Sequence, residues 1–201
     1  MKKAEKTRLK IIEQSAELFN RKGFAGTSVK DIMTETGLSK GGLYSHFAQG
    51  KEEIALAAFR HAVGVVYDAV GLRTHVIENS ADKLKAVIHY YRENIFSPPV
   101  EGGCPIQNTS VDANDGNPKL KAEVVAALND WQGRIIHTLN KGIENGEIRP
   151  DIDKEQFAVF YIGAIEGGIL MARAHDDDKY FDIMAQQILA EIENISTGVS
   201  K

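Results

Sequence analysis

The sequence has a single cysteine, Cys104, so no disulfide can form within the chain. One cysteine in 201 residues is typical of a protein from a reducing compartment, and it excludes the disulfide-rich domains of secreted proteins. No uninterrupted apolar run approaches the roughly 20 residues of a membrane-spanning helix. No apolar signal core follows the charged N-terminus either. These absences predict a cytoplasmic protein with no membrane partner.

Strand-like alternation, internal repeats and low-complexity tracts are also missing. Apolar residues recur at helical spacing instead, as in Leu9, Ile12, Ala16 and Phe19. The hydrophobic fraction of 43% and the charged fraction of 26% are those of an ordinary globular protein with a buried core. We therefore expect an all-α fold.

Sequence motifs of catalysis are absent too. The six histidines show no metal-ligand spacing, and no nucleophile–base motif or phosphate loop occurs. No enzyme activity, metal or cofactor is therefore predicted. The alternative is a helical enzyme or carrier that uses Cys104 and a histidine as its reactive pair.

Charge is distributed unevenly along the chain. Residues 1–51 contain ten basic and five acidic side chains, a net charge of +5, whereas residues 52–201 contain 14 basic and 23 acidic side chains, a net charge of −9. Electrostatic attraction to phosphate acts over roughly 8–10 Å at physiological salt, so the local charge matters more than the total of −4. This asymmetry favours a small nucleic-acid-binding head on an acidic body.

Short helices precede long ones in the predicted order of elements. A first helix ends at Lys22-Gly23, a second should run from Ser28 to Thr36, and a third from Lys40 to about Phe47. Longer helices are expected over 52–70, 81–96, 118–145, 154–175 and 179–195. The order predicts a head of residues 1–51 with three helices, followed by a helical bundle of residues 52–201.

The second and third helices have the pattern of a helix-turn-helix. Ser28 and Asp31 have the spacing of a capping box, and Gly37 ends the second helix just before the Ser39 cap. In such motifs the second helix of the pair enters the major groove of DNA. Because Leu43 and Phe47 face inward, the remaining side chains of that helix should contact DNA.

The candidate DNA-binding residues have three roles. Hydroxyls at the start of the first motif helix could donate to phosphate, as could Tyr44 and His46, while Lys51 would supply charge. Lys40 and the backbone of the adjacent glycines are the candidates for base contacts, since glycine allows a close approach. The predicted set is Thr27, Ser28, Lys40, Gly41, Gly42, Tyr44, Ser45, His46 and Lys51.

These stretches resemble the TetR/AcrR family of transcriptional regulators. The resemblance rests on Thr27-Ser28-Val29-Lys30-Asp31-Ile32, on Gly37-Leu38-Ser39-Lys40-Gly41-Gly42-Leu43-Tyr44-Ser45-His46-Phe47, and on Lys51-Glu52-Glu53-Ile54. It implies a homodimer with a helix-turn-helix head and a C-terminal bundle that binds a small molecule and releases the operator. The chain departs from the family at one point, because three residues rather than two separate Phe47 from Lys51.

The last two predicted helices are candidates for dimerisation. Both are strongly apolar, and Gly163 and Gly167 are four residues apart on one helix face, where small residues allow another helix to approach. An ordinary intramolecular core is the alternative, and the family resemblance favours a four-helix interface between two copies. The predicted interface residues are Phe160, Gly163, Gly167, Met184 and Ile188.

A ligand pocket between the helices of the body is the remaining expectation. Its candidate residues are His89, Tyr91, Phe96, Cys104 and Trp131. Cys104 could be a redox sensor, a pocket residue or a buried apolar side chain. Together these features predict a ligand-responsive repressor that binds palindromic operator DNA and responds to a small-molecule inducer of unknown identity.

Overall fold

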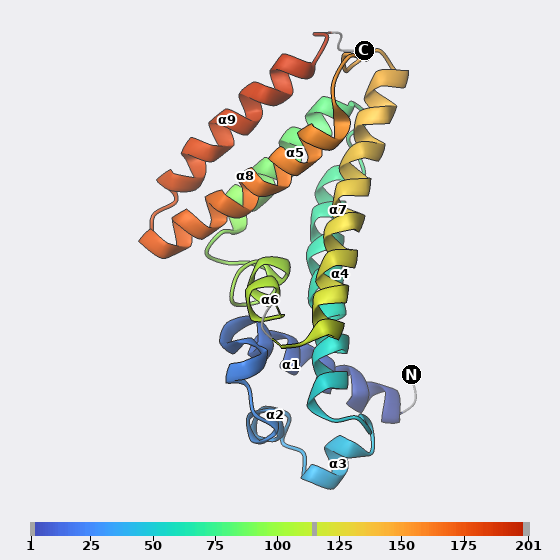
Figure 1. The fold of residues 1–201 in the computed structure, drawn as a ribbon, viewed down its shortest axis with the longest axis vertical. Helices are drawn as coiled ribbons and strands as arrows, with labels where there is room; N and C mark the ends of the chain where they lie inside the picture. The colour runs from blue at the N-terminus through green and yellow to red at the C-terminus, as the bar shows by residue number, and fades with distance from the viewer. Residues whose placement is uncertain (1–2, 114–115, 199–201) are drawn as a thin grey trace. The chain divides into compact units, whose positions relative to one another are not determined.

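The computed structural model describes residues 3–113 and 116–198, and these residues form nine α-helices (Figure 1). The helices are α1 Lys3–Gly26, α2 Val29–Thr36, α3 Lys40–Tyr44, α4 Lys51–Thr74, α5 Ser80–Asn94, α6 Pro105–Ala113, α7 Pro118–Glu144, α8 Lys154–His175 and α9 Lys179–Ile195. In this part of the chain, the isolated bridge between Ile148 and Ser196 is the only β-type pairing. The prediction of an all-α fold is confirmed.

The chain divides into two compact units that are each built from two segments. The first unit comprises Met1–Tyr67 and Pro98–Ala127, and the second comprises Asp68–Ser97 and Leu128–Lys201. Helices α4 and α7 contribute residues to both units. The predicted boundary after residue 51 divides DNA binding from ligand binding rather than one compact unit from another, and it stays a prediction.

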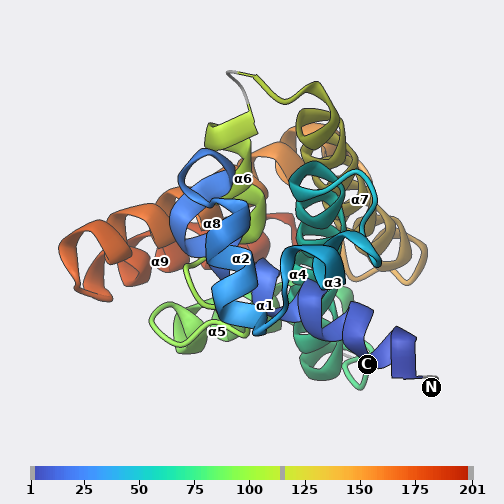
Figure 2. The same cartoon turned by 90° about the horizontal axis from the view of Figure 1, so that it is seen from below.

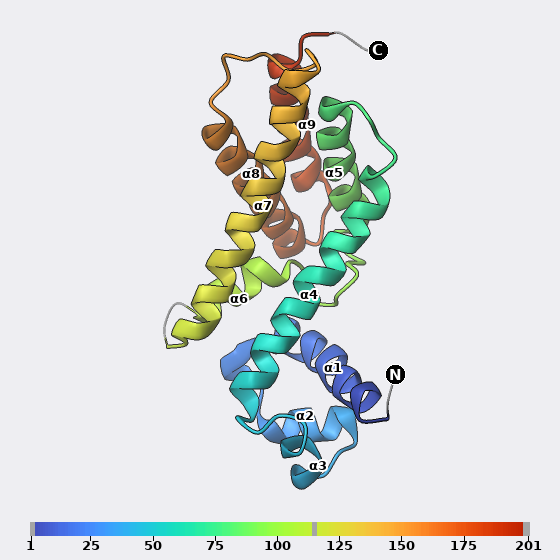
Figure 3. The same cartoon turned by 90° about the vertical axis from the view of Figure 1, so that its right-hand side faces the viewer.

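In the first unit, α1, α2 and α3 pack around the first turns of α4 (Figure 3). Their shared core consists of Ile11, Leu18, Ile32, Leu43, Phe47 and Ile54. Burial of an aliphatic or aromatic side chain of this size contributes about 1.5–3 kcal/mol relative to exposure. Phe47 lies fully within this core, so the chain between α3 and α4 is anchored to the head.

Helix α1 is broken at Gly23, where the sequence pattern predicts its end. Gly23 has a φ of 74° and a ψ of 168°, a conformation that favours glycine. A single helical turn, Phe24–Gly26, follows the break, and its first backbone N–H groups have no intrahelical acceptors. The Asp112 carboxylate of α6 accepts hydrogen bonds from the backbone N–H groups of Phe24 and Ala25.

Helix α6 is held against α1 by a network of amide side chains. The Asn20 side chain donates to the carbonyls of Glu101 and Gly103, at 2.8 and 3.0 Å. The Asn108 side-chain nitrogen lies 3.0 Å from the carbonyl oxygens of Asn20 and Gly102 and from the Asn20 side-chain oxygen. This segment therefore belongs to the same compact unit as the head, although about 80 residues separate it from α1.

In the second unit, α8 packs side by side with α9, and both also pack against α5 (Figure 1). Its buried side chains include Leu84, Ile88, Tyr161, Ile165, Ile169, Phe181, Ile188 and Ile192. Gly168 permits the close approach of α8 and α9, because a Cβ at this position would lie 2.9 Å from the Phe181 ring. The Tyr161 hydroxyl donates to the Leu84 carbonyl at 2.7 Å, which satisfies a fully buried polar group.

A buried carboxylate caps the start of α5. Glu147 is 6% exposed, and it accepts a hydrogen bond from the backbone N–H of Ser80 at 2.9 Å. The Glu147 carbonyl also accepts from the backbone N–H of Thr197 at 3.0 Å. One residue therefore connects the turn after α7 to the start of α5 and to the segment after α9.

The long helices have the predicted positions, and the short helices show the differences. Helix α3 ends at Tyr44 rather than near Phe47. The sequence pattern did not predict α6 at all. Helices α4 and α8 are long and apolar enough to cross a membrane by length and composition alone, a test that core helices of soluble proteins also pass.

Candidate DNA-binding site

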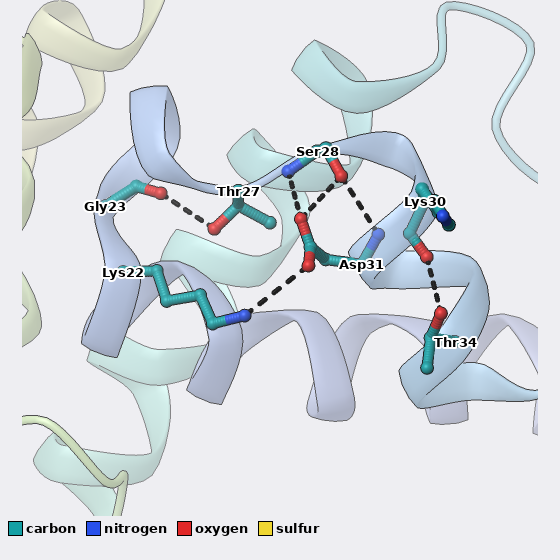
Figure 4. A network of polar contacts seen from close by, with 7 residues as sticks. All are labelled: Lys22, Gly23, Thr27, Ser28, Lys30, Asp31 and Thr34. Atoms are coloured by element: carbon teal, nitrogen blue, oxygen red, sulfur yellow. Dashed lines mark hydrogen bonds and ion pairs between the residues drawn. The ribbon is translucent and has the colours of Figure 1, made fainter.

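Helix α2 begins with a capping box (Figure 4). The Ser28 hydroxyl accepts from the Asp31 backbone N–H at 3.1 Å, and the Asp31 carboxylate accepts from the Ser28 backbone N–H at 2.8 Å. The Ser28 hydroxyl also donates to the same carboxylate. This hydroxyl, the Ser28 N–H and Lys22 lower the pKa of Asp31 from 3.8 to about 2. The box predicted from the spacing is therefore formed.

The two hydroxyls predicted to bind phosphate have partners inside the fold. Thr27 is fully buried, and its hydroxyl donates to the Gly23 carbonyl at 2.8 Å (Figure 4). Ser28 is exposed, but its hydroxyl hydrogen points to the Asp31 carboxylate, which would also repel a phosphate. Both hydroxyl hydrogens are therefore engaged within the fold, whereas donation to a phosphate would need a hydrogen that is free.

The turn between α2 and α3 uses a left-handed glycine and a serine cap. Gly37 has a φ of 69° and ends α2, and Ser39 accepts from the Gly42 backbone N–H at 3.2 Å. Leu43 is fully buried and fixes the inner face of α3. The opposite face of α3 therefore points outward.

The two glycines of α3 are not required by the fold. Neither glycine has a positive φ, the backbone conformation that would require glycine. A Cβ on Gly41 would meet nothing within 4 Å, and a Cβ on Gly42 would make only ordinary contacts with Ser39 and Leu38. Glycine in a helix costs up to about 1 kcal/mol relative to alanine. Two consecutive glycines on an exposed helix therefore have no intramolecular explanation.

The polar residues around the end of α3 differ in their availability. Tyr44 is 38% exposed, and Lys40 lies 6.0 Å from its ring centre. A Cβ on Gly50 would come within 3.2 Å of the Tyr44 ring and hydroxyl, so the tyrosine lies directly over this turn. Ser45 is exposed, but its hydroxyl donates to the Gly42 carbonyl at 2.8 Å. His46 is half-buried.

Lys51 occupies a different environment from the exposed residues of α3. Its ammonium lies 4.1 Å from the centre of the Phe24 ring, a cation–π distance. Burial lowers the pKa of Lys51, and the charge of Asp112 partly offsets that effect. The extra residue before Lys51 is accommodated by Gly50, which has a φ of 69°. The packing of Lys51 on Phe24 connects the start of α4 to the end of α1.

The remaining charges of the head divide into paired and unpaired groups. Three cations have acidic partners, in the pairs Arg8–Glu53, Arg21–Glu101 and Lys22–Asp31. Among the described residues, five exposed lysines of the head have no acidic partner within ion-pair distance, namely Lys3, Lys6, Lys10, Lys30 and Lys40. The sequence pattern assigned a role only to Lys40, although the charge count already included the other four.

Comparisons with known proteins match this arrangement. Residues 11–58 match the family model described as bacterial regulatory proteins of the tetR family, and residues 80–188 match the tetracyclin repressor-like C-terminal domain. The second match alone covers more than half of the chain. The chain belongs to the TetR family of bacterial transcriptional regulators. The predicted family is thus confirmed, and it is a family of DNA-binding regulators rather than of enzymes.

Several relatives resemble the chain over nearly its whole length. A TetR transcriptional regulator from Chloroflexus aurantiacus has a TM-score of 0.92, 35% identity and 98% coverage of both chains. The transcriptional regulator LmrA of Bacillus subtilis is 42% identical over 83% of this chain and 86% of its own. The transcriptional repressor DhaR of Mycobacterium sp. is 23% identical over 92% of this chain and 94% of its own.

The five predicted ligand-pocket residues do not form one cluster in this TetR-family chain. Tyr91 and Trp131 are in contact, with ring centres 6.0 Å apart, and Trp131 is buried. His89 and Phe96 are exposed, and Phe96 retains 51% of its accessible surface. Cys104 is buried but belongs to the other compact unit. Among the four predicted residues of the second unit, only Tyr91 and Trp131 are brought together.

Tyr90, which the sequence pattern did not indicate, is a neighbour of this aromatic pair. Tyr90 packs edge to face on Tyr91, with ring centres 5.4 Å apart, and is 6% exposed. Its hydroxyl has no hydrogen-bond partner among the described residues, and burial raises its pKa. A buried hydroxyl without a partner costs about 1–3 kcal/mol. The helical spacing of Ala81, Leu84 and Ile88 continues to Tyr91, so it gave no signal for Tyr90.

The predicted dimer residues divide between exposed and buried positions. Phe160 is 40% exposed, and a Cβ on Gly163 or Gly167 would meet nothing within 4 Å. Met184 is half-buried. Ile188 is fully buried inside its own chain, and this placement argues against a contact with a partner, because its side chain belongs to the core that α9 forms with α5 and α8.

Proposed function

We propose that this TetR-family regulator is a repressor that binds a palindromic operator as a homodimer and is released by a small-molecule inducer. The observation that carries the proposal is the outer face of α3, with its unneeded glycines beside Lys40 and Tyr44. A missing Cβ on an exposed helix permits a base edge or a phosphate to approach the backbone closely. The relative DhaR from Mycobacterium sp. is named as a transcriptional repressor, which supports repression rather than activation.

The proposed contacts to DNA are narrower than the predicted set. Lys40 and the backbone at Gly41 and Gly42 are proposed to approach base edges. Tyr44 and His46 are proposed to contact phosphates. Thr27, Ser28 and Ser45 support this surface through internal hydrogen bonds rather than through DNA contacts. Lys51 is proposed to act through its packing on Phe24.

An exposed apolar stripe on α8 supports dimerisation. Val159, Phe160, Leu170 and Met171 retain between 40% and 62% of their accessible surface. Gly163 and Gly167 lie in the same stretch of α8, so a second helix could approach closely. Ile183 of α9 is 56% exposed and can extend the same surface. A palindromic operator needs two α3 helices at successive major grooves, roughly 34–36 Å apart, and a homodimer supplies two such helices.

The aromatic cluster of Tyr90, Tyr91 and Trp131 supports a ligand site in the body. A ligand with a hydrogen-bonding group could satisfy the buried Tyr90 hydroxyl while its apolar part packs on the rings. Residues 52–201 would thus bind the inducer and the partner copy in the cytoplasm, and residues 1–51 would bind DNA. The inducer releases DNA only by binding more tightly to the conformation that cannot span the operator.

Substitution of Gly41 by alanine tests the DNA-binding part of the proposal. The operator is first recovered by selection from random duplexes. We expect Gly41→Ala to weaken operator binding by tenfold or more, because the added methyl group would obstruct the approach of DNA. The thermal stability should not fall, because alanine has a higher helix propensity than glycine. Gly133→Ala, an exposed glycine of α7, is the matched control and should leave operator affinity unchanged. Unchanged affinity in Gly41→Ala would contradict the proposed reading face.

Two further measurements test the other parts. Light scattering should give a dimer for the wild-type chain, and Leu170→Glu should weaken it, since a carboxylate would be buried in the interface. A thermal-shift screen of metabolites can find the inducer, because a ligand at 100 times its dissociation constant adds about 2.7 kcal/mol of stability. Tyr90→Phe should then reduce that ligand's shift while leaving the ligand-free protein at least as stable. A monomeric wild type or an unaffected Tyr90→Phe would refute these parts.

A further inference from the structure

One face of α1 carries its charges in two separate blocks. Lys3, Lys6 and Lys10 are followed on the same face by Glu13 and Glu17, at successive spacings of three and four residues. All five side chains are exposed. Glu5, the acidic residue of the first turn, lies on the opposite side of the helix. The first turns of α1 therefore present a basic surface, and the middle of the helix presents an acidic one.

This order of charges opposes the local electrostatics of a helix. Lysines near a helix N-terminus are repelled by the positive end of the helix dipole, and lysines three or four residues apart repel one another. A helix that is only solvated would be more stable with the glutamates first. Among the described residues, Lys3 and Lys6 have no acidic partner that offsets this repulsion, so their arrangement points to a negatively charged partner.

The basic block lies next to the helix-turn-helix. The Lys10 ammonium donates to the carbonyl of Thr36, the last residue of α2, at 3.1 Å. Lys3 lies seven residues before Lys10, or about 10 Å along the helix axis. The first turns of α1 are uncovered on the side of the molecule from which α3 is seen (Figure 2). Lys3 and Lys6 share the face of α1 that carries Lys10, so they continue the exposed surface beside the end of α2.

We infer that Lys3 and Lys6 contact phosphates of the DNA that flanks the sequence read by α3. The inference rests on the proposed operator binding. It adds a second, sequence-independent contact outside the helix-turn-helix. Lys10 is a positioning residue, because its bond to the Thr36 carbonyl fixes this face of α1 relative to the motif. Glu13 and Glu17 would repel phosphates, so the DNA would contact only the first turns of α1.

The test compares two variants that lose the same charge. Lys3→Gln combined with Lys6→Gln removes the proposed contacts, and Lys83→Gln combined with Lys121→Gln removes two positive charges from the surface of α5 and α7. Binding to the selected operator duplex is measured by fluorescence anisotropy over a range of salt concentrations. Each phosphate contact contributes about 0.9 to the slope of log affinity against log salt. For a dimer, we expect the slope to become less steep by about 3.6 in the α1 variant, and the control to keep the wild-type slope.

Duplex length supplies a second readout. Extra base pairs on both sides of the operator should strengthen binding of the wild type and of the control, but should add little for the α1 variant. An α1 variant with wild-type slope and wild-type gain from the flanks would overturn the inference while leaving the proposed function intact. A wild-type chain that selects no duplex would refute the proposed function and this inference together. The α1 variant should melt at the wild-type temperature or slightly above it, since both lysines are exposed and oppose the helix dipole.

Discussion

Helices α2 and α6 are both short, and both belong to the first compact unit, but different kinds of bonds hold them. The start of α2 is fixed by Ser28 and Asp31, which are three residues apart. Helix α6 is fixed by Asn108 and Asp112, whose partners on α1 are more than 80 residues away. One helix is stabilised locally, and the other depends on the tertiary structure.

This difference predicts how the stability of each helix responds to substitutions. A lost cap weakens one end of α2, which the buried Ile32 still holds in the core. A lost partner for α6 also leaves unsatisfied amides on α1, so two elements are weakened at once. The variants below separate the two cases by the size of their effect.

Gly102→Ala should have the largest effect. A Cβ at this position would lie 2.7 Å from the Asn20 carbonyl oxygen, and the φ of 110° is unfavourable for alanine. Because the obstructing atom is backbone, the α1–α6 contact must open, at a cost of about 3 kcal/mol or more. Chemical denaturation measures this change. Gly133→Ala is the control, and a loss of stability as small as in that control would mean that α6 does not depend on this close approach.

Asp112→Ala should have the next largest effect. The substitution removes the acceptor for the Phe24 and Ala25 backbone N–H groups, and hydrogen bonds to a charged group contribute about 1.5–3 kcal/mol. We expect a loss of about 2 kcal/mol and faster hydrogen exchange at residues 24–26. Val111→Ala on the exposed side of α6 should change stability by less than about 0.5 kcal/mol. Equal effects of the two variants would refute the anchoring role of the carboxylate.

Ser28→Ala should be milder. Loss of a serine N-cap costs about 1 kcal/mol, and the effect should be confined to the first turn of α2. Ser28→Thr keeps the hydroxyl and should restore most of that stability. Hydrogen exchange that accelerates across α6 as well as α2 would contradict the local character of this cap.

The smallest effect should be the pH dependence of the same cap. The pKa of Asp31 is about 2 in the folded chain, below its ordinary 3.8. Its stabilisation is therefore complete above about pH 4 and is lost as the pH falls through 2. A carbon-13 NMR titration should give a pKa near 2, and Ser28→Ala should raise it toward 3.8. An Asp31 pKa that is the same in both proteins would show that the serine does not stabilise the carboxylate.

The sequence predicted most of the helix-turn-helix because its signals are local. Ser28, Gly37 and Ser39 act on neighbouring backbone groups, so their spacing is enough to place α2 and the start of α3. The long amphipathic helices were predictable for the same reason, since their apolar spacing is contained within each segment. Residue roles that depend on distant partners were not predictable in this way.

Lys51 and Thr27 illustrate that limit. The sequence places both beside the motif, but Lys51 packs on Phe24 and Thr27 is buried beneath the break at Gly23. Ile188 is another case, because periodicity cannot tell which apolar face of α9 meets the same chain and which is left exposed. The orphaned hydroxyl of Tyr90 likewise becomes visible only when its surroundings are known.

By itself, the sequence determined the helical class, the regulator family and the outward face of α3, because periodicity, caps and glycine positions act over a few residues. The tertiary structure alone decided that α6 forms and joins α1, which hydroxyls and lysines of the head are already engaged, and which face of α8 remains apolar and exposed. These outcomes depend on partners many residues away, whose proximity no local pattern encodes.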